Sequence, residues 1–209
     1  MTSLPDNILH LPEYHVLATK MEEHDLHYQV EAPEPLACEE CGVESEFVRF
    51  GKRDVAYRDL PIHGKRVTLW VVRRRYTCRA CGRTFRPALP EMVDDHRMTR
   101  RLYNHVEKEA FNHPYAYVAD TTGLDEKTVR EIFKKKAEFL AAWHRFETPR
   151  CLGIDELYLN RRYRCILTNL EERTLLDLLP GRQQDAVTRR LMSMTERHQV
   201  EIVSMDMWK

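Results

Sequence analysis

Two nearly identical cysteine pairs constrain this chain more than any other feature of its sequence. Each pair has the form Cys-x-x-Cys-Gly: Cys38 and Cys41 make the first, and Cys78 and Cys81 make the second. In this spacing two thiolates on a tight turn point toward one metal ion, and the glycine that follows relieves the turn of a Cβ clash. Four sulfur ligands complete a closed tetrahedral site, so the sequence predicts one structural zinc bound by all four cysteines.

Two alternatives to zinc are a pair of local disulfides and a redox-active dithiol. A stable disulfide needs an oxidising compartment, and the N-terminus, with Asp6, His10 and Glu13 among its apolar residues, does not resemble a secretory signal. A redox Cys-x-x-Cys is typical of a thioredoxin-like βαβ context, which the sequence around these pairs lacks. We therefore favour zinc, and we interpret the two single cysteines, Cys151 and Cys165, as buried and unreactive.

The segment between the cysteine pairs is longer than that of a usual zinc ribbon, and its apolar runs are typical of β-strands. Two further strand-like runs precede it and are expected to extend the same sheet. We predict strands at residues 15–21, 25–31, 46–50, 53–59 and 67–77. On this interpretation residues 1–91 form a β-rich zinc-binding module.

Charge is unevenly distributed, although the 209 residues include 33 basic and 33 acidic side chains. Residues 36–91 hold twelve Lys or Arg against seven Asp or Glu. A basic module in a neutral protein can bind a polyanion, although an ordinary solvated surface explains the same composition. Within this module we expect DNA contacts from three consecutive arginines, Arg73, Arg74 and Arg75.

Residues 92–148 have the pattern of a helix-turn-helix. We predict a first helix from an N-cap at Thr99 to about Ala110, a short helix at 115–121, a glycine turn at 122–124 and a longer helix capped by Asp125. The N-terminal turns of such a second helix enter the DNA major groove. The alternative is an ordinary helical hairpin with a solvated basic face. The residues expected to contact DNA are Lys127, Thr128, Arg130 and Lys134.

Residues 149–209 have the pattern of the first half of an RNase H-like α/β domain. Strands are expected at 151–159, 162–168 and 174–179, followed by a helix at 185–198 and a fourth strand at 201–205. In that fold the fourth strand lies beside the first, so Asp155 and Asp206 would stand side by side. Adjacent carboxylates are natural ligands for Mg²⁺, although a single strand aspartate is more often structural. The whole chain is thus predicted to be an α+β protein of several modules.

The order of these parts resembles that of insertion-sequence transposases of the DDE class, specifically the ISL3 family. The most specific motifs are residues 57–65 and 74–85, similar to the family's zinc module, where an Asp-Leu-Pro turn and an arginine-rich strand lead into the second cysteine pair. Residues 153–156 and 203–208 are similar to the strands that carry the family's first and second catalytic aspartates.

The resemblance implies a DNA transposase that recognises terminal inverted repeats through its zinc and helix-turn-helix modules. Asp155 and Asp206 would be catalytic and would bind Mg²⁺ or Mn²⁺. The implied reaction cleaves a phosphodiester at the end of the element and joins the released 3′-hydroxyl to target DNA. Because transposases act on two ends together, a homo-oligomer on double-stranded DNA is also implied.

The family's third acidic residue, a glutamate on a later helix, has no counterpart before Lys209. We therefore expect a truncated form that binds DNA without cutting it. The alternative is a non-catalytic DNA-binding regulator built from the zinc and helix-turn-helix parts. No apolar run approaches the roughly 18 residues that a membrane helix needs, so we expect a cytoplasmic protein, nucleoid-associated when bound to DNA and without a membrane partner.

Overall fold

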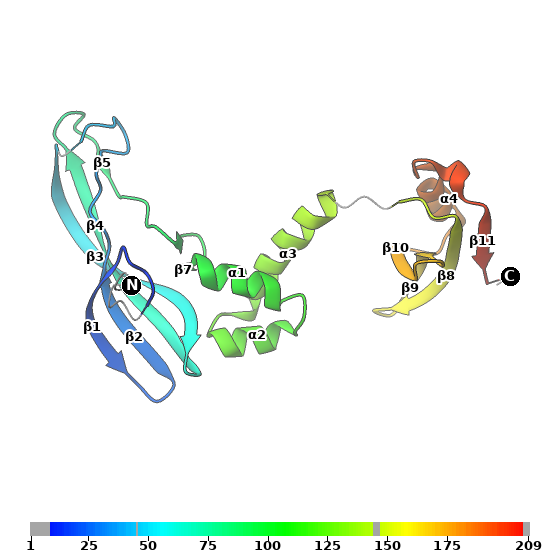
Figure 1. Ribbon diagram of the computed structural model, residues 1–209, viewed down its shortest axis with the longest axis horizontal. Helices are drawn as coiled ribbons and strands as arrows, with labels where there is room; N and C mark the ends of the chain where they lie inside the picture. The colour runs from blue at the N-terminus through cyan, green and yellow to red at the C-terminus, as the bar shows by residue number, and fades with distance from the viewer. Residues whose placement is uncertain (1–8, 45, 144–146, 207–209) are drawn as a thin grey trace, which may run out of the picture. The chain divides into compact units, whose positions relative to one another are not determined.

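The structure is a computed structural model that describes residues 9–44, 46–143 and 147–206 (Figure 1). The chain forms two compact units, Met1–Ala142 and Trp143–Lys209. The described residues make a β-rich α+β protein, as the sequence predicts. Within them, no helix is both long enough and apolar enough to cross a bilayer.

The first unit is built on one mixed sheet with the strand order β1-β2-β4-β3-β7-β6, in which β5 also pairs with β4. Apolar residues alternate along β4, so that Val67, Leu69 and Val71 are fully buried against the core. This period-two pattern is what turns one face of a sheet into a core. The strands are β1 His15–Met21, β2 Asp25–Glu31, β3 Phe47–Ile62, β4 Lys65–Cys78, β5 Thr84–Phe85, β6 Met92–Val93 and β7 Met98–Thr99.

The two strands predicted at 46–50 and 53–59 form one continuous strand, β3, so their separation was wrong. The pairing of Arg49 with Tyr76 and of Lys52 with Arg74 leaves two residues of β3 opposite one residue of β4. This is a β-bulge, and it contains Gly51 with φ of +117°, a backbone angle that favours glycine. Glycine therefore bends the strand here and does not end it.

Three helices complete the first unit: α1 Arg100–Glu109, α2 Tyr115–Thr122 and α3 Glu126–Trp143. Thr99 caps α1, as predicted, because its hydroxyl accepts a hydrogen bond from the Leu102 amide. Gly123 ends α2 in the left-handed conformation with φ of 71°. A second core forms where the three helices meet, around Leu102, Val118 and Ile132, all buried.

The second unit is a four-stranded sheet with the order β10-β9-β8-β11, covered by one helix. Strand β11 is parallel to β8, and the other pairs are antiparallel. The core packs apolar residues of the sheet, such as Leu152 and Leu167, against Val187 and Leu191 of the helix. The elements are β8 Cys151–Leu159, β9 Arg162–Asn169, β10 Thr174–Leu179, α4 Gln184–Met192 and β11 Ile202–Met205.

The helix predicted to reach residue 198 ends earlier, at Met192. The Ser193 hydroxyl donates a hydrogen bond of 2.7 Å to the Arg190 carbonyl and so satisfies one of the last helical acceptors. Glu196 then has a φ of 56°, which turns the chain into the short 3-10 helix Arg197–Gln199.

Candidate functional site

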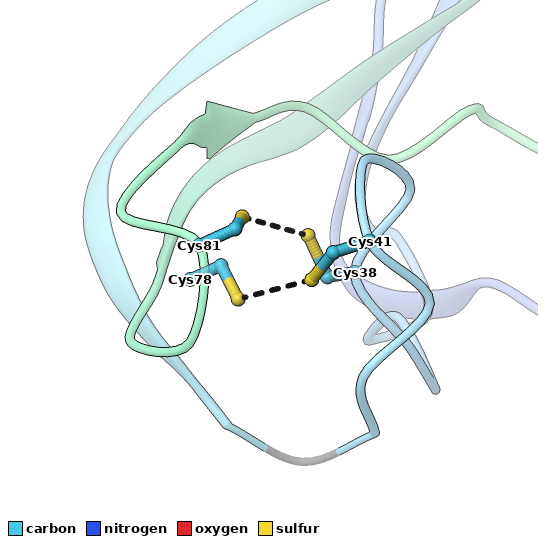
Figure 2. Close-up of side chains that lie close together, drawn as sticks. All are labelled: Cys38, Cys41, Cys78 and Cys81. Atoms are coloured by element: carbon cyan, nitrogen blue, oxygen red, sulfur yellow. Dashed lines mark hydrogen bonds between the residues drawn. The ribbon is translucent and has the colours of Figure 1, made fainter.

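The four cysteines of the two pairs come together in one cluster (Figure 2). Each pair lies on a turn closed by the glycine that follows it: the Gly42 amide donates to the Cys38 carbonyl at 2.8 Å, and the Gly82 amide to the Cys78 carbonyl at 3.0 Å. Both glycines have positive φ, 75° and 71°, as their place after the second cysteine predicted. The four sulfurs therefore face one another from two near-identical turns.

The spacing of the sulfurs suits a zinc ion and excludes a disulfide. Cys38 and Cys81 are 3.9 Å apart at sulfur, and Cys41 and Cys78 are 3.7 Å apart, whereas a disulfide needs about 2.05 Å. A tetrahedral zinc with Zn–S bonds of about 2.3 Å has sulfur–sulfur edges of about 3.8 Å. All four cysteines are free. The cluster thus supports a structural zinc.

Two of these thiols have pKa values that are shifted in opposite directions. Hydrogen bonds to the sulfur, the strongest from the Cys81 backbone, lower the pKa of Cys78 to about 7. At Cys41 the Val43 amide favours the thiolate, but burial and the neighbouring sulfurs outweigh it and raise the pKa to about 12. Four thiolates this close repel one another without a cation, so a divalent metal is the natural counter-charge.

Packing around the cluster holds the two turns together. The aromatic rings of Phe47, Tyr76 and Phe85 contact one another beside the buried Cys38 and Cys78. Arg83, after the second pair, also donates a hydrogen bond of 2.7 Å to Glu40 within the first pair. Contacts around the ligating residues, such as these, help to fix the orientation of metal ligands.

The second candidate site is the start of α3. Lys127, Arg130 and Lys134 are exposed and each forms an ion pair one helical turn away, at 3.9, 2.8 and 3.8 Å. Exposed ion pairs of this kind contribute little to stability, so a phosphate group can replace the glutamate partners. Thr128 lines an open groove of about 650 Å³ together with sheet residues that include Arg58 and Trp70.

The three consecutive arginines of β4 have different surroundings. Arg73 donates 2.8 Å to Asp94 and 3.1 Å to the Tyr57 hydroxyl, and its side chain is 13% exposed. Arg74 forms an ion pair with Glu31 in β2. Arg75 lies over the ring of Phe50, 4.9 Å from its centroid. The first two are therefore already neutralised within the protein.

The third candidate site is a pocket of about 500 Å³ in the second unit, lined by both Asp155 and Asp206. The parallel register pairs Met205 of β11 with Ile154 of β8, so Asp206 follows β11 at the level of Asp155. Among the described residues no cation forms an ion pair with either carboxylate. Met207 and Trp208, part of the motif around Asp206, lie outside the described residues.

Two residues of this pocket were missed by sequence reasoning. Glu156 forms an ion pair with Arg182 at 2.7 Å, and the guanidinium of Arg182 lies over the ring of Tyr163, 4.4 Å from its centroid. The pocket thus contains a third carboxylate, already paired, and one cation. The neighbouring acids Asp155-Glu156 were the visible signal, but the loop that carries Arg182 has no pattern that predicts its position.

Two family models match the chain. Residues 34–81 match the zinc-finger of transposase IS204/IS1001/IS1096/IS1165, and residues 152–209 match the transposase domain of the ISL3 family. The chain belongs to the ISL3 transposase family. The first match contains all four clustered cysteines, and the second contains Asp155 and Asp206. No curated protein and no solved structure matches the chain significantly.

Proposed function

We propose that this ISL3-family chain takes part in DNA transposition through an acidic metal site at Asp155 and Asp206. The observation that carries the proposal is the parallel pairing of β11 with β8, since Asp155 on β8 and Asp206 after β11 line one pocket. The strand order β10-β9-β8-β11 with a helix before β11 also supports an RNase H-like fold for this unit.

The donor set of the pocket fits Mg²⁺ or Mn²⁺. Carboxylate oxygens are hard ligands, and the side chains of Asp155 and Asp206 are exposed and lack a cationic partner within the described chain. Glu156 is different because Arg182 pairs with it. A metal held by the two aspartates would stabilise the attacking and leaving oxygens of a phosphodiester displacement.

A backbone hydrogen bond would help to orient one of the two metal-binding carboxylates. The Glu156 amide donates a hydrogen bond of 2.7 Å to Asp155 Oδ1, which restricts the orientation of that carboxylate. In the reaction we propose, water cleaves a phosphodiester at the element's end, and the released 3′-hydroxyl attacks target DNA. Two ends must be joined, so we propose a homo-oligomer that works on double-stranded DNA in the cytoplasm, at the nucleoid.

We propose that α1, α2 and α3 form a helix-turn-helix that recognises the terminal inverted repeats. The short α2, the left-handed Gly123 and the exposed basic start of α3 support this assignment. Lys127, Thr128 and Arg130 would contact bases or phosphates there, and Lys134, one turn later, a phosphate.

Binding of Mn²⁺ to the zinc-loaded protein tests the acidic site. Water-proton relaxation should detect a weak Mn²⁺ site in the native chain that Asp155→Asn or Asp206→Asn abolishes. Asp185→Asn, in the exposed first turn of α4, is the matched control and should leave the site intact. Unchanged Mn²⁺ binding in both site variants would contradict the proposal and favour a DNA-binding protein without catalysis.

A further inference from the structure

Four cations surround the bulge of β3. Lys52 and Arg53 follow Gly51 directly, Arg75 lies opposite the bulge on β4, and Arg86 follows β5. With Gly51 and Arg73 they line a hollow of about 120 Å³. We call Lys52, Arg53, Arg75 and Arg86 the bulge cluster; only Arg75 was expected from the sequence to contact DNA.

Among the described residues no close ion pair neutralises the bulge cluster, and Asp94 interacts with Arg53 only at longer range. In the described residues no carboxylate lies within ion-pair distance of its four members, whereas Arg73 and Arg74 are paired with Asp94 and Glu31. Lys52, Arg53 and Arg86 are exposed to solvent. Cations gathered without closely paired acids repel one another, and a bound polyanion relieves that repulsion.

The local backbone keeps the hollow open and the cluster in place. Gly51 has no Cβ, and the position where one would lie has no neighbour within 4 Å. Arg53 is in register with Arg73, on the face of β4 that also carries Arg75, and the guanidinium of Arg75 is supported by the Phe50 ring. A phosphate can therefore approach both the main chain and several side chains at once.

We propose that the bulge cluster binds the phosphate backbone of duplex DNA, as a second contact besides α3. This inference rests on the proposed DNA-binding function and adds a site to it. The contact is independent of sequence because it is made to phosphates, and it holds the duplex while α3 reads the bases. Arginine and lysine that neutralise phosphates release counterions, so this contact weakens steeply with salt.

The test is the affinity of the triple variant Arg53→Ala, Arg75→Ala, Arg86→Ala for two duplexes of equal length. One duplex carries the element's terminal repeat and the other has a scrambled sequence. We expect at least a tenfold loss of affinity on both, by the same factor. The slope of log affinity against log salt should shrink by about 0.9 for each phosphate contact removed.

A matched control removes the same charge at scattered exposed sites: Lys108→Ala, Arg162→Ala, Arg189→Ala. Binding of the cluster variant that equals that of this control would overturn the proposal, as would a loss confined to the terminal repeat. The triple lysine variant of the cluster keeps the charge and should bind nearly as the native chain does. Lysine variants as weak as the alanine variants would indicate damage to the fold and contradict a phosphate contact.

Failure of this inference differs from failure of the helix-turn-helix assignment. If Lys127→Ala with Arg130→Ala leaves the preference for the terminal repeat unchanged while the cluster variant loses affinity for both duplexes, the bulge cluster stands and the assignment of α3 fails. If the native chain binds neither duplex, both fail.

Discussion

The buried carboxylate of Asp59 in β3 accepts a hydrogen bond of 2.6 Å from the hydroxyl of Thr99, the residue that caps α1. Arg101 adds a second bond of 2.7 Å to the same carboxylate oxygen, and the Leu60 amide a third of 2.8 Å. Asp59 is the aspartate of the Asp-Leu-Pro motif that the family resemblance singled out; the turn expected there is absent, because these three residues lie within β3. It joins the zinc-bearing sheet to the first helix.

Asp59→Asn should destabilise the first unit by about 3 kcal/mol. The substitution keeps the size of the side chain but leaves Arg101 without its counter-charge, and breaking a buried ion pair costs about 3–5 kcal/mol. Urea unfolding followed by circular dichroism measures the loss. Asp54→Asn, on an exposed position of the same strand, is the control and should change stability by less than about 0.5 kcal/mol. Equal stability of the two variants would refute the role of Asp59.

Cys81→Ser should release the zinc and unfold the sheet near the cluster. Structural zinc contributes on the order of 10 kcal/mol to the folding of small modules, which is comparable to the whole stability of a domain, about 5–15 kcal/mol. Elemental analysis of purified protein should give one zinc per native chain and none in the variant. Cys165→Ser, at a buried cysteine outside the cluster, should keep its zinc, although it disturbs the second unit. A native chain purified without zinc would contradict the site.

Lys127→Ala combined with Arg130→Ala should weaken binding to the terminal repeat by at least about 30-fold. Each lost base contact costs about 1–3 kcal/mol of discrimination. The substitutions also remove the exposed ion pairs with Glu131 and Glu126, but such pairs contribute little to stability. Competition with scrambled duplex measures the preference. A control variant at two exposed sites outside α3 and the zinc turns, Lys108→Ala with Arg162→Ala, should keep that preference.

Acid should destabilise the first unit partly through Glu31. Its hydrogen bond to Arg74 lowers the pKa of the Glu31 carboxyl in the folded state. A lowered folded pKa means that the stabilisation is present above the unfolded value of about 4.3 and is lost as pH falls through the folded one. The urea midpoint should drop less between about pH 5 and 3 in Glu31→Gln than in the native chain. Glu44→Gln, at an exposed glutamate, should follow the native curve, which also separates this effect from acid release of zinc.

Local sequence signals predicted much of the secondary structure. The two strand-like runs around a Glu-Glu-His turn match β1 and β2 at their observed bounds, and the Thr99 cap and Gly123 marked the helices correctly. These signals are local, since they depend on neighbours within a few residues. The cysteine spacing was as informative, because four ligands of one ion must converge wherever the chain between them runs.

Features that depend on distant partners could not be predicted. Nothing near Arg73 or Arg74 in the sequence indicates that Asp94 and Glu31 neutralise them, whereas no ion pair of Arg75 is found in the described part of the chain. The ion pair of Glu156 with Arg182 spans 26 residues and depends on how the loop before α4 folds. We interpreted Gly51 as the end of a strand, because a bulge and a turn both favour glycine and the sequence does not distinguish them.

The hydrogen bonds of Asp59 to Thr99 and Arg101 have a consequence for the proposed binding of duplex DNA. Asp59 joins β3, which carries the bulge, to the start of α1, and α1 packs against α3 in one core, so the bulge cluster and the start of α3 belong to the same compact unit. A duplex completes a turn in about 10–10.5 base pairs, so one inserted base pair rotates everything beyond it by about 34°. A protein that holds two contacts at a constant separation therefore senses helical phase. Inserting about 5 base pairs between the two contacted segments should turn one of them away, and about 10 should restore its orientation but not its distance.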